Sequence, residues 1–413
     1  MTGTTDITLG FMPLLDSAVL IATSEMGFAE EENVRLRLVR ETSWANIRDR
    51  VAVGHFDGAH MLAPMPIAFN LGLGPISVPV VAPLALGLGG NAVTVSNGLY
   101  EAIARHAAID LRKPAETGAA LKQVVGERVA KGEKPLVFAV VHPYSGHNYE
   151  LRYWLAACGI DPDKDIEIVI VPPPLMPDAL LRGAIDGFCV GEPWNTVAVS
   201  SGAGHMATVK AAIWRSSPEK VLGLSRHFVE TEPDATAGLI RAAWRASAWC
   251  AKPENAETLA RLLAGPSWLD QDERHMLPAI TGRLVDAGGH TIDMPDFFLP
   301  HQRAATFPWQ SHALWYYSQM VRWGHVTHSP ANALIARDSY RPDLYRKALT
   351  AANLLVPAAN MKVEGALSGP VYVGASDVGL QLGPDGFFDG RIFDPDRLEH
   401  YLQNGMAEPL FSR

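Results

Sequence analysis

The sequence predicts an α/β protein with two similar lobes, each built on a mainly parallel, doubly wound sheet. Short apolar segments alternate with helix-like segments, and this alternation occurs twice, near residues 7–62 and near residues 136–190. Strands and helices that alternate in this way usually form parallel sheets covered by helices. A short motif shared by the two series favours two similar lobes over one extended sheet.

The first series contains three expected strands and two expected helices. The apolar residues at 34, 36 and 38 alternate with arginines, which is the period of a half-buried strand. Polar residues that can accept hydrogen bonds from first-turn N–H groups precede both helices. In chain order we expect a strand at Ile7–Met12, a helix capped by Asp16 or Ser17 that stops near Gly27, a strand around Val34–Leu38, a helix capped by Thr42 or Ser43 that ends before Gly54, and a strand at about Phe56–Leu62.

The second series follows the same order, and the chain then becomes more helical. Helical periodicity dominates beyond Gly202, and no long linker interrupts the chain. The expected elements are a strand at Leu136–Val141, a helix at Asn148–Cys158, a strand at Ile166–Val171, a short helix at Pro177–Gly183, a strand at Phe188–Val190, and helices at Ala237–Cys250, Ala256–Leu263, Ser311–Trp323 and Asp394–Gln403.

One local pattern occurs in both series. Gly54-His-Phe-Asp57-Gly58-Ala59 recurs as Gly183-Ala-Ile-Asp186-Gly187-Phe188, each time between a short helix and a strand, and a Pro-containing turn follows each copy. From this repeat we expect lobe 1 to comprise residues 1–96, lobe 2 to comprise residues 97–195, and residues 196–413 to return to lobe 1 and add a C-terminal helical extension that packs on it.

Composition excludes several classes of protein. The chain has 413 residues, of which 48% are hydrophobic and 19% charged, as in soluble globular proteins. Its 35 basic and 44 acidic residues give a net charge of −9, which disfavours a nucleic-acid surface. Pro75, Pro79 and Pro83 interrupt the most apolar stretch, so it is not an ordinary membrane-spanning helix. The first residues lack the basic segment and long apolar run of a secretory signal, so we expect a cytoplasmic protein, or a periplasmic one if a signal was removed.

Catalytic and metal-binding motifs are absent from the sequence. It contains no G-x-S-x-G elbow and no phosphate-binding loop of the G-x-x-x-x-G-K-[ST] type. His55 and His60 are five residues apart, as are His142 and His147, a spacing that suits one face of a helix or strand poorly. Cys158, Cys189 and Cys250 are isolated and fit buried thiols. No enzyme activity, cofactor or metal is therefore expected.

Several positions suit the recognition of a small oxyanion. Trp44 and His147 lie at expected helix starts, where N–H donors converge. The glycine stretch that begins at Gly87 exposes backbone amides to close approach, although a simple turn explains it equally well. Asn91 offers an amide donor, and Lys220 offers a cation in a helix or turn. Periodicity alone does not place these residues in one pocket.

The sequence resembles a known family, the nitrate- and bicarbonate-binding proteins of cyanobacterial-type ABC transporters. It also resembles their cytoplasmic relatives that sense nitrate and nitrite. The likeness covers most of the chain. The matching segments are Thr42-Ser-Trp44, Asp57-Gly-Ala-His60-Met-Leu-Ala-Pro64-Met-Pro66, Leu151-Arg-Tyr-Trp154, Pro172-Pro-Pro174, Phe188-Cys-Val-Gly-Glu192-Pro-Trp194-Asn195, Pro218-Glu-Lys220-Val-Leu-Gly, Ser311-His-Ala-Leu-Trp315 and Arg322-Trp-Gly324.

This resemblance implies a two-lobed, C-shaped fold of the type II periplasmic-binding-protein kind, the Venus flytrap, with an anion held between the lobes. By position, Trp44, His147, the carbonyl region near Pro173 and Lys220 would line the site. A lysine at this position accompanies nitrate in the family, whereas bicarbonate binders have an acidic residue there. The family usually has glutamine near Asn91, and this difference leaves the ligand identity open.

The resemblance also implies two possible roles. The first is a cytoplasmic nitrate or nitrite sensor that controls an RNA-binding antiterminator with an ANTAR domain in nitrate assimilation; this group resembles the sequence better. The alternative is the solute-binding receptor of an ABC transporter for nitrate, or for bicarbonate or a sulfonate, with a transporter permease as its partner. A third reading is an enzyme resembling the synthases of the thiamine pyrimidine precursor, which the isolated cysteines disfavour.

Overall fold

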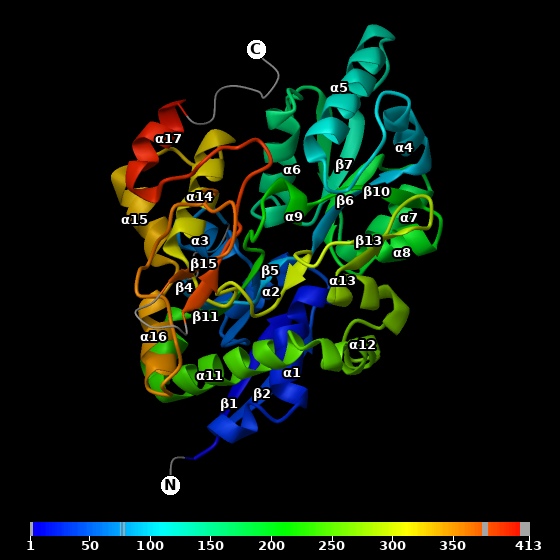
Figure 1. Cartoon of the computed structure of the whole chain (residues 1–413). Helices are drawn as coiled ribbons and strands as arrows, with labels where there is room; N and C mark the ends of the chain where they lie inside the picture. The colour runs from blue at the N-terminus through cyan, green and yellow to red at the C-terminus, as the bar shows by residue number, and fades with distance from the viewer. Residues whose placement is uncertain (1–2, 75, 77–78, 374–378, 405–413) are drawn as a thin grey trace.

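The chain forms two lobes, each built on a five-stranded sheet (Figure 1). The computed structural model describes residues 3–74, 76, 79–373 and 379–404, so Pro75, named above, lies outside the described residues. The strand order is β2-β1-β3-β11-β4 in lobe 1 and β8-β7-β9-β6-β10 in lobe 2. In each sheet the first three strands are parallel, and the fourth runs antiparallel to both of its neighbours. The two lobes therefore share one topology.

The strands of the two sheets agree closely with the two predicted series where the sequence pattern was clear. Lobe 1 contains β1 (Thr5–Phe11), β2 (Val34–Arg40), β3 (Gly58–Leu62), β4 (Val80–Ala85) and β11 (Lys220–Ser225). Lobe 2 contains β6 (Asn91–Ser96), β7 (Leu136–Val140), β8 (Ile166–Ile170), β9 (Gly187–Gly191) and β10 (Gly204–Val209). Three short pairs complete the described strands: β5 (Leu88–Gly89) with β14 (Phe298–Leu299), β12 (Arg283–Val285) with β13 (Thr291–Asp293), and β15 (Val371–Val373) with β16 (Leu380–Leu382).

Helices cover both sheets and form a C-terminal layer. In Figure 1 the C-terminal helices lie on one side of the molecule, where α14 contacts α15, α17 and also α6 of lobe 2. The described helices are α1 (Ala18–Glu25), α2 (Trp44–Ala52), α3 (Met65–Asn70), α4 (Asn97–Ala104), α5 (Pro114–Ala130), α6 (Gly146–Ala157), α7 (Met176–Leu181), α8 (Trp194–Ser200), α9 (Lys210–Ile213), α10 (Arg226–Thr231), α11 (Pro233–Cys250), α12 (Ala256–Ala264), α13 (Leu277–Thr281), α14 (Gln310–Arg322), α15 (Pro330–Asp338), α16 (Pro342–Thr350) and α17 (Leu398–Asn404). Within the described ranges no helix is both long and apolar enough to cross a membrane.

The repeated Asp-Gly motif has the same structural role in both lobes. The Asp57 backbone N–H donates to Thr8 O, and its carboxylate accepts from Thr8 N at 2.8 Å. Asp186 makes the same two bonds with Val137, again with 2.8 Å between the carboxylate and the backbone nitrogen. Asp57 thereby anchors the start of β3 beside β1, and Asp186 anchors the start of β9 beside β7. The weak sequence repeat thus marks a true structural equivalence.

The chain crosses between the lobes twice, and the crossovers lie away from the expected boundaries. Because β6 and β10 both belong to the sheet of lobe 2, the chain leaves lobe 1 between β4 and residue 91 and returns between residues 209 and 220. The expected boundaries at residues 96 and 195 assigned β6 and β10 to lobe 1. We propose that lobe 2 comprises residues 91–209, with the segment at 210–219 as the second crossover.

The structure also differs from the sequence-based expectation at prolines and at Lys220. Pro66 lies in the first turn of α3, and Pro193 precedes α8, where turns were expected. Proline is tolerated there because the first-turn N–H groups have no partner within the helix. Lys220, expected in a helix or turn, begins strand β11. The predicted C-terminal helix at Asp394–Gln403 begins later, with α17.

The expectation of buried thiols is confirmed, since all three cysteines are free and buried.

We expect Gly58→Ala to destabilise the protein. A Cβ at Gly58 would overlap the backbone oxygen of Gly223 on the antiparallel neighbour β11, so strand pairing must distort. Overpacking of this kind costs about 1–3 kcal/mol, and a urea or thermal unfolding curve would measure it. Gly98→Ala in α4 is the matched control, because no heavy atom lies within 4 Å of its Cβ position. Equal stability of the two variants would contradict this account of the close strand contact.

Candidate ligand-binding site between the lobes

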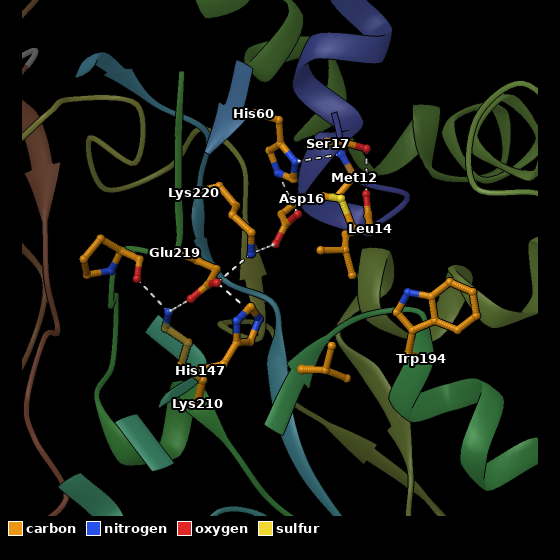
Figure 2. A network of polar contacts seen from close by, with 12 residues as sticks. Met12, Leu14, Asp16, Ser17, His60, His147, Trp194, Lys210, Glu219 and Lys220 are labelled. Carbon is orange, nitrogen blue, oxygen red and sulfur yellow. Dashed lines mark hydrogen bonds and ion pairs between the residues drawn. The ribbon is translucent and has the colours of Figure 1, made fainter. Parts of the chain in front are cut away.

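A cluster of titratable side chains is buried where the two lobes meet (Figure 2). Every member is at most 4% exposed, so the cluster is shielded from water. Buried charges are costly unless they are paired, and most of their polar atoms are paired here. The members are Asp16, His60, His147, Glu150, Lys210, Glu219 and Lys220.

Lys220 lies at the centre of the cluster. Its Nζ lies 2.6 Å from Asp16 Oδ2 and 2.6 Å from Glu219 Oε1, and it is 5.7 Å from the centre of the Trp44 ring. Burial alone would raise the pKa of the Asp16 carboxyl, but the Lys220 ammonium and His60 together hold that pKa below its ordinary value. Lys220 therefore lies beside Trp44, together with two carboxylates that were not assigned to the site from the sequence.

Lys210 forms the second cationic centre. Its Nζ lies 2.5 Å from Glu219 Oε2, 2.8 Å from Glu150 Oε1 and 2.6 Å from the carbonyl oxygen of Pro218. The Glu219 carboxylate thus joins both ammonium groups. Burial would raise the pKa of Glu219, but the basic groups around it hold that pKa well below the ordinary value, so Glu219 is an anion at neutral pH.

Two buried histidines flank the carboxylates. His60 Nε2 lies 2.9 Å from Asp16 Oδ1, and His147 Nε2 lies 3.3 Å from Glu219 Oε1. Burial lowers the pKa of both imidazoles, that of His147 to about 3, because desolvation disfavours the charged form. Both rings are therefore neutral at neutral pH, and the two lysines carry the positive charge of the cluster.

Three side chains at this site contain buried polar atoms without a hydrogen-bond partner. These atoms are Nε1 of Trp44, the amide nitrogen and oxygen of Asn91, and Nδ1 of His147, whose Nε2 faces Glu219. The Trp44 and His147 rings are 6.4 Å apart. A Cβ at Gly191 would lie 3.2 Å from Asn91 Oδ1 and 3.3 Å from Asp16 Oδ2, which places Asn91 next to the Lys220 pair. Unmade hydrogen bonds of buried donors cost about 1–3 kcal/mol each, so these groups suit a ligand rich in acceptors.

Local sequence explains how these side chains are positioned. Ser43 caps α2 by accepting from Asn46 N, and Ser145 caps α6 by accepting from Asn148 N, so Trp44 and His147 lie in the first turns of two capped helices. Lys220 and Asn91 occupy equivalent places in the two sheets: Lys220 pairs with Leu62, the last residue of β3, and Asn91 pairs with Gly191, the last residue of β9.

Two further residues of the expected site are placed by their backbones. Gly87 has φ of 129°, a region that favours glycine, and its Cα faces the backbone of Leu299 and Pro300. Pro173 begins a 3₁₀ turn after β8, where its carbonyl oxygen accepts a hydrogen bond from Met176 N. The structure therefore joins Trp44, Asn91, His147 and Lys220 through contacts around one cluster, while the described contacts of Gly87 and Pro173 are with other parts of the chain.

Sequence reasoning missed the acidic half of the cluster. Asp16 was considered only as a helix cap, while His60 and Glu219 lay in segments that carry the resemblance but were not assigned to the site. Glu150 and Lys210 gave no local signal, because their proximity depends on contacts between α6, α9 and the 210–219 crossover. Among the residues that the structure describes, no group of three or more His, Cys, Asp or Glu is arranged to hold a metal ion.

Comparison with known proteins agrees with this architecture. The model described as the NMT1-like family matches residues 2–264. The nitrate/nitrite binding protein NrtA of Synechococcus elongatus is 31% identical over 407 residues, which cover 96% of this chain and 85% of that protein. The bicarbonate-binding protein CmpA of a Synechococcus species is 29% identical over 413 residues, covering 96% of this chain and 86% of that protein.

Solved structures give the same result for the fold. The periplasmic nitrate-binding protein NrtA from Synechocystis PCC 6803 has a TM-score of 0.84 and 27% identity, covering 97% of this chain and 98% of that chain. The alkanesulfonate-binding protein SsuA from Xanthomonas axonopodis is similar in fold alone, with a TM-score of 0.54 and 12% identity over 78% of this chain and 95% of that chain. The expected two-lobed fold of the periplasmic-binding-protein kind is thus confirmed. The family match and the extended identity together show that the chain belongs to the NMT1-like family, alongside nitrate/nitrite-binding and bicarbonate-binding proteins.

Proposed function

We propose that the chain is the solute-binding receptor of an ABC transporter and that it holds nitrate or nitrite between its lobes. The observation that carries this proposal is the buried Lys220 ammonium beside unpartnered polar atoms of Trp44, Asn91 and His147. The names of the relatives support it, since they include nitrate/nitrite binding proteins and a nitrate import ATP-binding protein.

The chemistry of the unpartnered groups favours an anion with acceptors only. The Trp44 indole and the Asn91 amide offer N–H donors without partners, whereas the single N–H of a neutral His147 imidazole is near the Glu219 carboxylate. Each oxygen of nitrate or nitrite accepts hydrogen bonds, and charge-assisted bonds to an anion are stronger than neutral ones. In this proposal Lys220 supplies the cation, and the backbone near Gly87 and Pro173 completes the wall of the site.

The receptor role is preferred to the cytoplasmic sensor that the sequence analysis put first. The relatives compared are solute-binding proteins and ATP-binding components of import systems, and one solved relative is described as periplasmic. They give no support to an ANTAR-domain partner or to a cytoplasmic location. An ABC transporter is therefore the proposed partner, and periplasmic exposure follows from that role.

Calorimetric titration of the purified chain tests the function directly. Nitrate, nitrite, bicarbonate and an aliphatic sulfonate are titrated separately, and we expect nitrate or nitrite to bind at one site per chain more tightly than the other two anions. The reason is that the site combines a cation with N–H donors and excludes water. Absence of heat with nitrate and nitrite, or tighter binding of bicarbonate, would refute the proposed ligand.

Trp44→Phe tests the role of the indole N–H. Phenylalanine retains an aromatic ring beside Lys220 but removes the unpartnered donor. Hydrogen bonds to charged groups contribute about 1.5–3 kcal/mol, so nitrate affinity should fall about 10- to 100-fold in calorimetry. Trp309→Phe is the matched control, because Trp309 is also buried but packs against Phe307 just before α14. A similar loss of affinity in both variants would argue against a direct role for Trp44.

A further inference from the structure

The cluster contains more acidic than cationic groups. Asp16, Glu150 and Glu219 supply three carboxyls, whereas Lys210 and Lys220 supply two ammonium groups, and direct contacts link all five. Burial keeps both nearby histidines neutral at neutral pH. If all three carboxyls were ionised, the cluster would carry one uncompensated negative charge even before an anion entered it.

A bound monoanion makes this imbalance larger. An uncompensated charge in a buried site costs several kcal/mol, because the lost hydration is not replaced. With the anion bound, the excess is two negative charges; a proton on one carboxyl lowers it to one, at the expense of only about 1.4 kcal/mol for each pH unit above its pKa. Anion binding to this cluster is therefore strongly favoured when one carboxyl is neutral.

Geometry identifies Glu150 as the group that carries the proton. Asp16 contacts Lys220 and His60, and Glu219 contacts both lysines, so these two carboxylates are well paired. Glu150 contacts one lysine through Oε1 and shares that lysine with Glu219. Its Oε2 is buried and has no hydrogen-bond partner. An ionised Glu150 would leave part of its charge on this unpartnered oxygen.

The surroundings of Glu150 agree with a neutral carboxyl. It faces Lys210 from α9, Glu219 from the crossover, Lys220 from β11, Tyr316 from α14, whose hydroxyl lies 3.4 Å from Oε1, and Cys189 from β9. Burial is the largest influence and raises the pKa of Glu150 to about 8, despite the attraction of Lys210. The carboxyl is therefore mostly neutral at pH 7 and ionises just above it.

We propose that Glu150 is the proton carrier of the site, such that the anion binds only while Glu150 Oε2 is protonated. This inference rests on the proposed function, because it assumes a monoanionic ligand in the cluster. The step moves one proton from solvent to Oε2 and changes no other bond. Below the pKa of Glu150 the proton is already in place, so binding takes up none. Above that pKa each bound anion brings one proton with it.

Nitrate titrations in two buffers of different ionisation enthalpy test this linkage. The difference in heat between the buffers gives the number of protons taken up per nitrate. We expect uptake to rise from near zero at about pH 6.5 to near one at about pH 9.5, with the apparent Kd increasing about tenfold per pH unit above about pH 8. Nitrate is a suitable probe because it does not titrate in this range.

Two isosteric variants locate the proton. Glu150→Gln is permanently neutral, so its nitrate affinity should not depend on pH and its proton uptake should be near zero. Glu192→Gln is the matched control: Glu192 is also buried, its pKa is raised by burial to about 7, and its Oε2 accepts from Thr196 N outside the lysine pairs. The control should retain the uptake of the unmodified chain.

The outcomes distinguish a failure of the proton linkage from a failure of the proposed function. Nitrate binding by the unmodified chain without proton uptake at about pH 9.5 overturns the proton linkage but leaves the proposed function intact. No binding at any pH overturns the proposed function and this inference with it. Uptake that persists in Glu150→Gln, or that disappears in Glu192→Gln, rejects the assignment to Glu150. The result for the unmodified chain decides on linkage even if a variant fails to fold.

Discussion

The bridge that Glu219 forms between two lysines is the interaction on which the rest of the site depends. One carboxylate oxygen contacts Lys210, which begins α9 after the last strand of lobe 2, and the other contacts Lys220, which begins β11 in lobe 1. Glu219 itself lies in the crossover between them. The neighbouring helix start must leave room for this carboxylate, and Gly146 does so because a Cβ there would overlap Glu219 Oε2. The Glu219 carboxylate and the two lysine ammonium groups therefore both link the lobes at the crossover and carry the charge of the site.

The site also reflects the common topology of the two lobes. Parallel strands end at one edge of each sheet, and ligands in open α/β folds bind at such edges. Asp16 follows β1 and His147 follows the equivalent strand β7, while Lys220 and Asn91 begin the equivalent antiparallel strands β11 and β6. The two lobes thus have the same topology but place different side chains at the interface between them. Lobe 1 contributes the Lys220 ammonium, and lobe 2 contributes the Asn91 amide.

The sequence predicted the parts of this arrangement that have local signals. Apolar alternation located the parallel strands, and the Asp57-Gly58 and Asp186-Gly187 repeat indicated two equivalent lobes. Strands β6, β10 and β11 were missed because they pair with strands distant in the chain, so the expected lobe boundaries were displaced. Trp44 and His147 were proposed for the site as residues at expected helix starts, and Lys220 was proposed as a cation and through a resemblance. Glu150 was missed because an acidic residue inside a helix usually faces solvent, and only the packing of α6 against α9 and α14 buries it.

Closure of the lobes explains why the balance of charge matters so much here. Trp44 and His147 belong to different lobes, as do Pro13 and Trp194, whose backbone oxygen and indole Nε1 are 3.2 Å apart. Any opening that admits a ligand must separate these pairs and hydrate the cluster. On closing, water leaves and each charge must be matched inside the protein, because the surrounding medium no longer screens it. If the cluster holds the ligand as proposed, a ligand of the wrong charge is rejected by the cost of closing the lobes around it, even where it fits the available space.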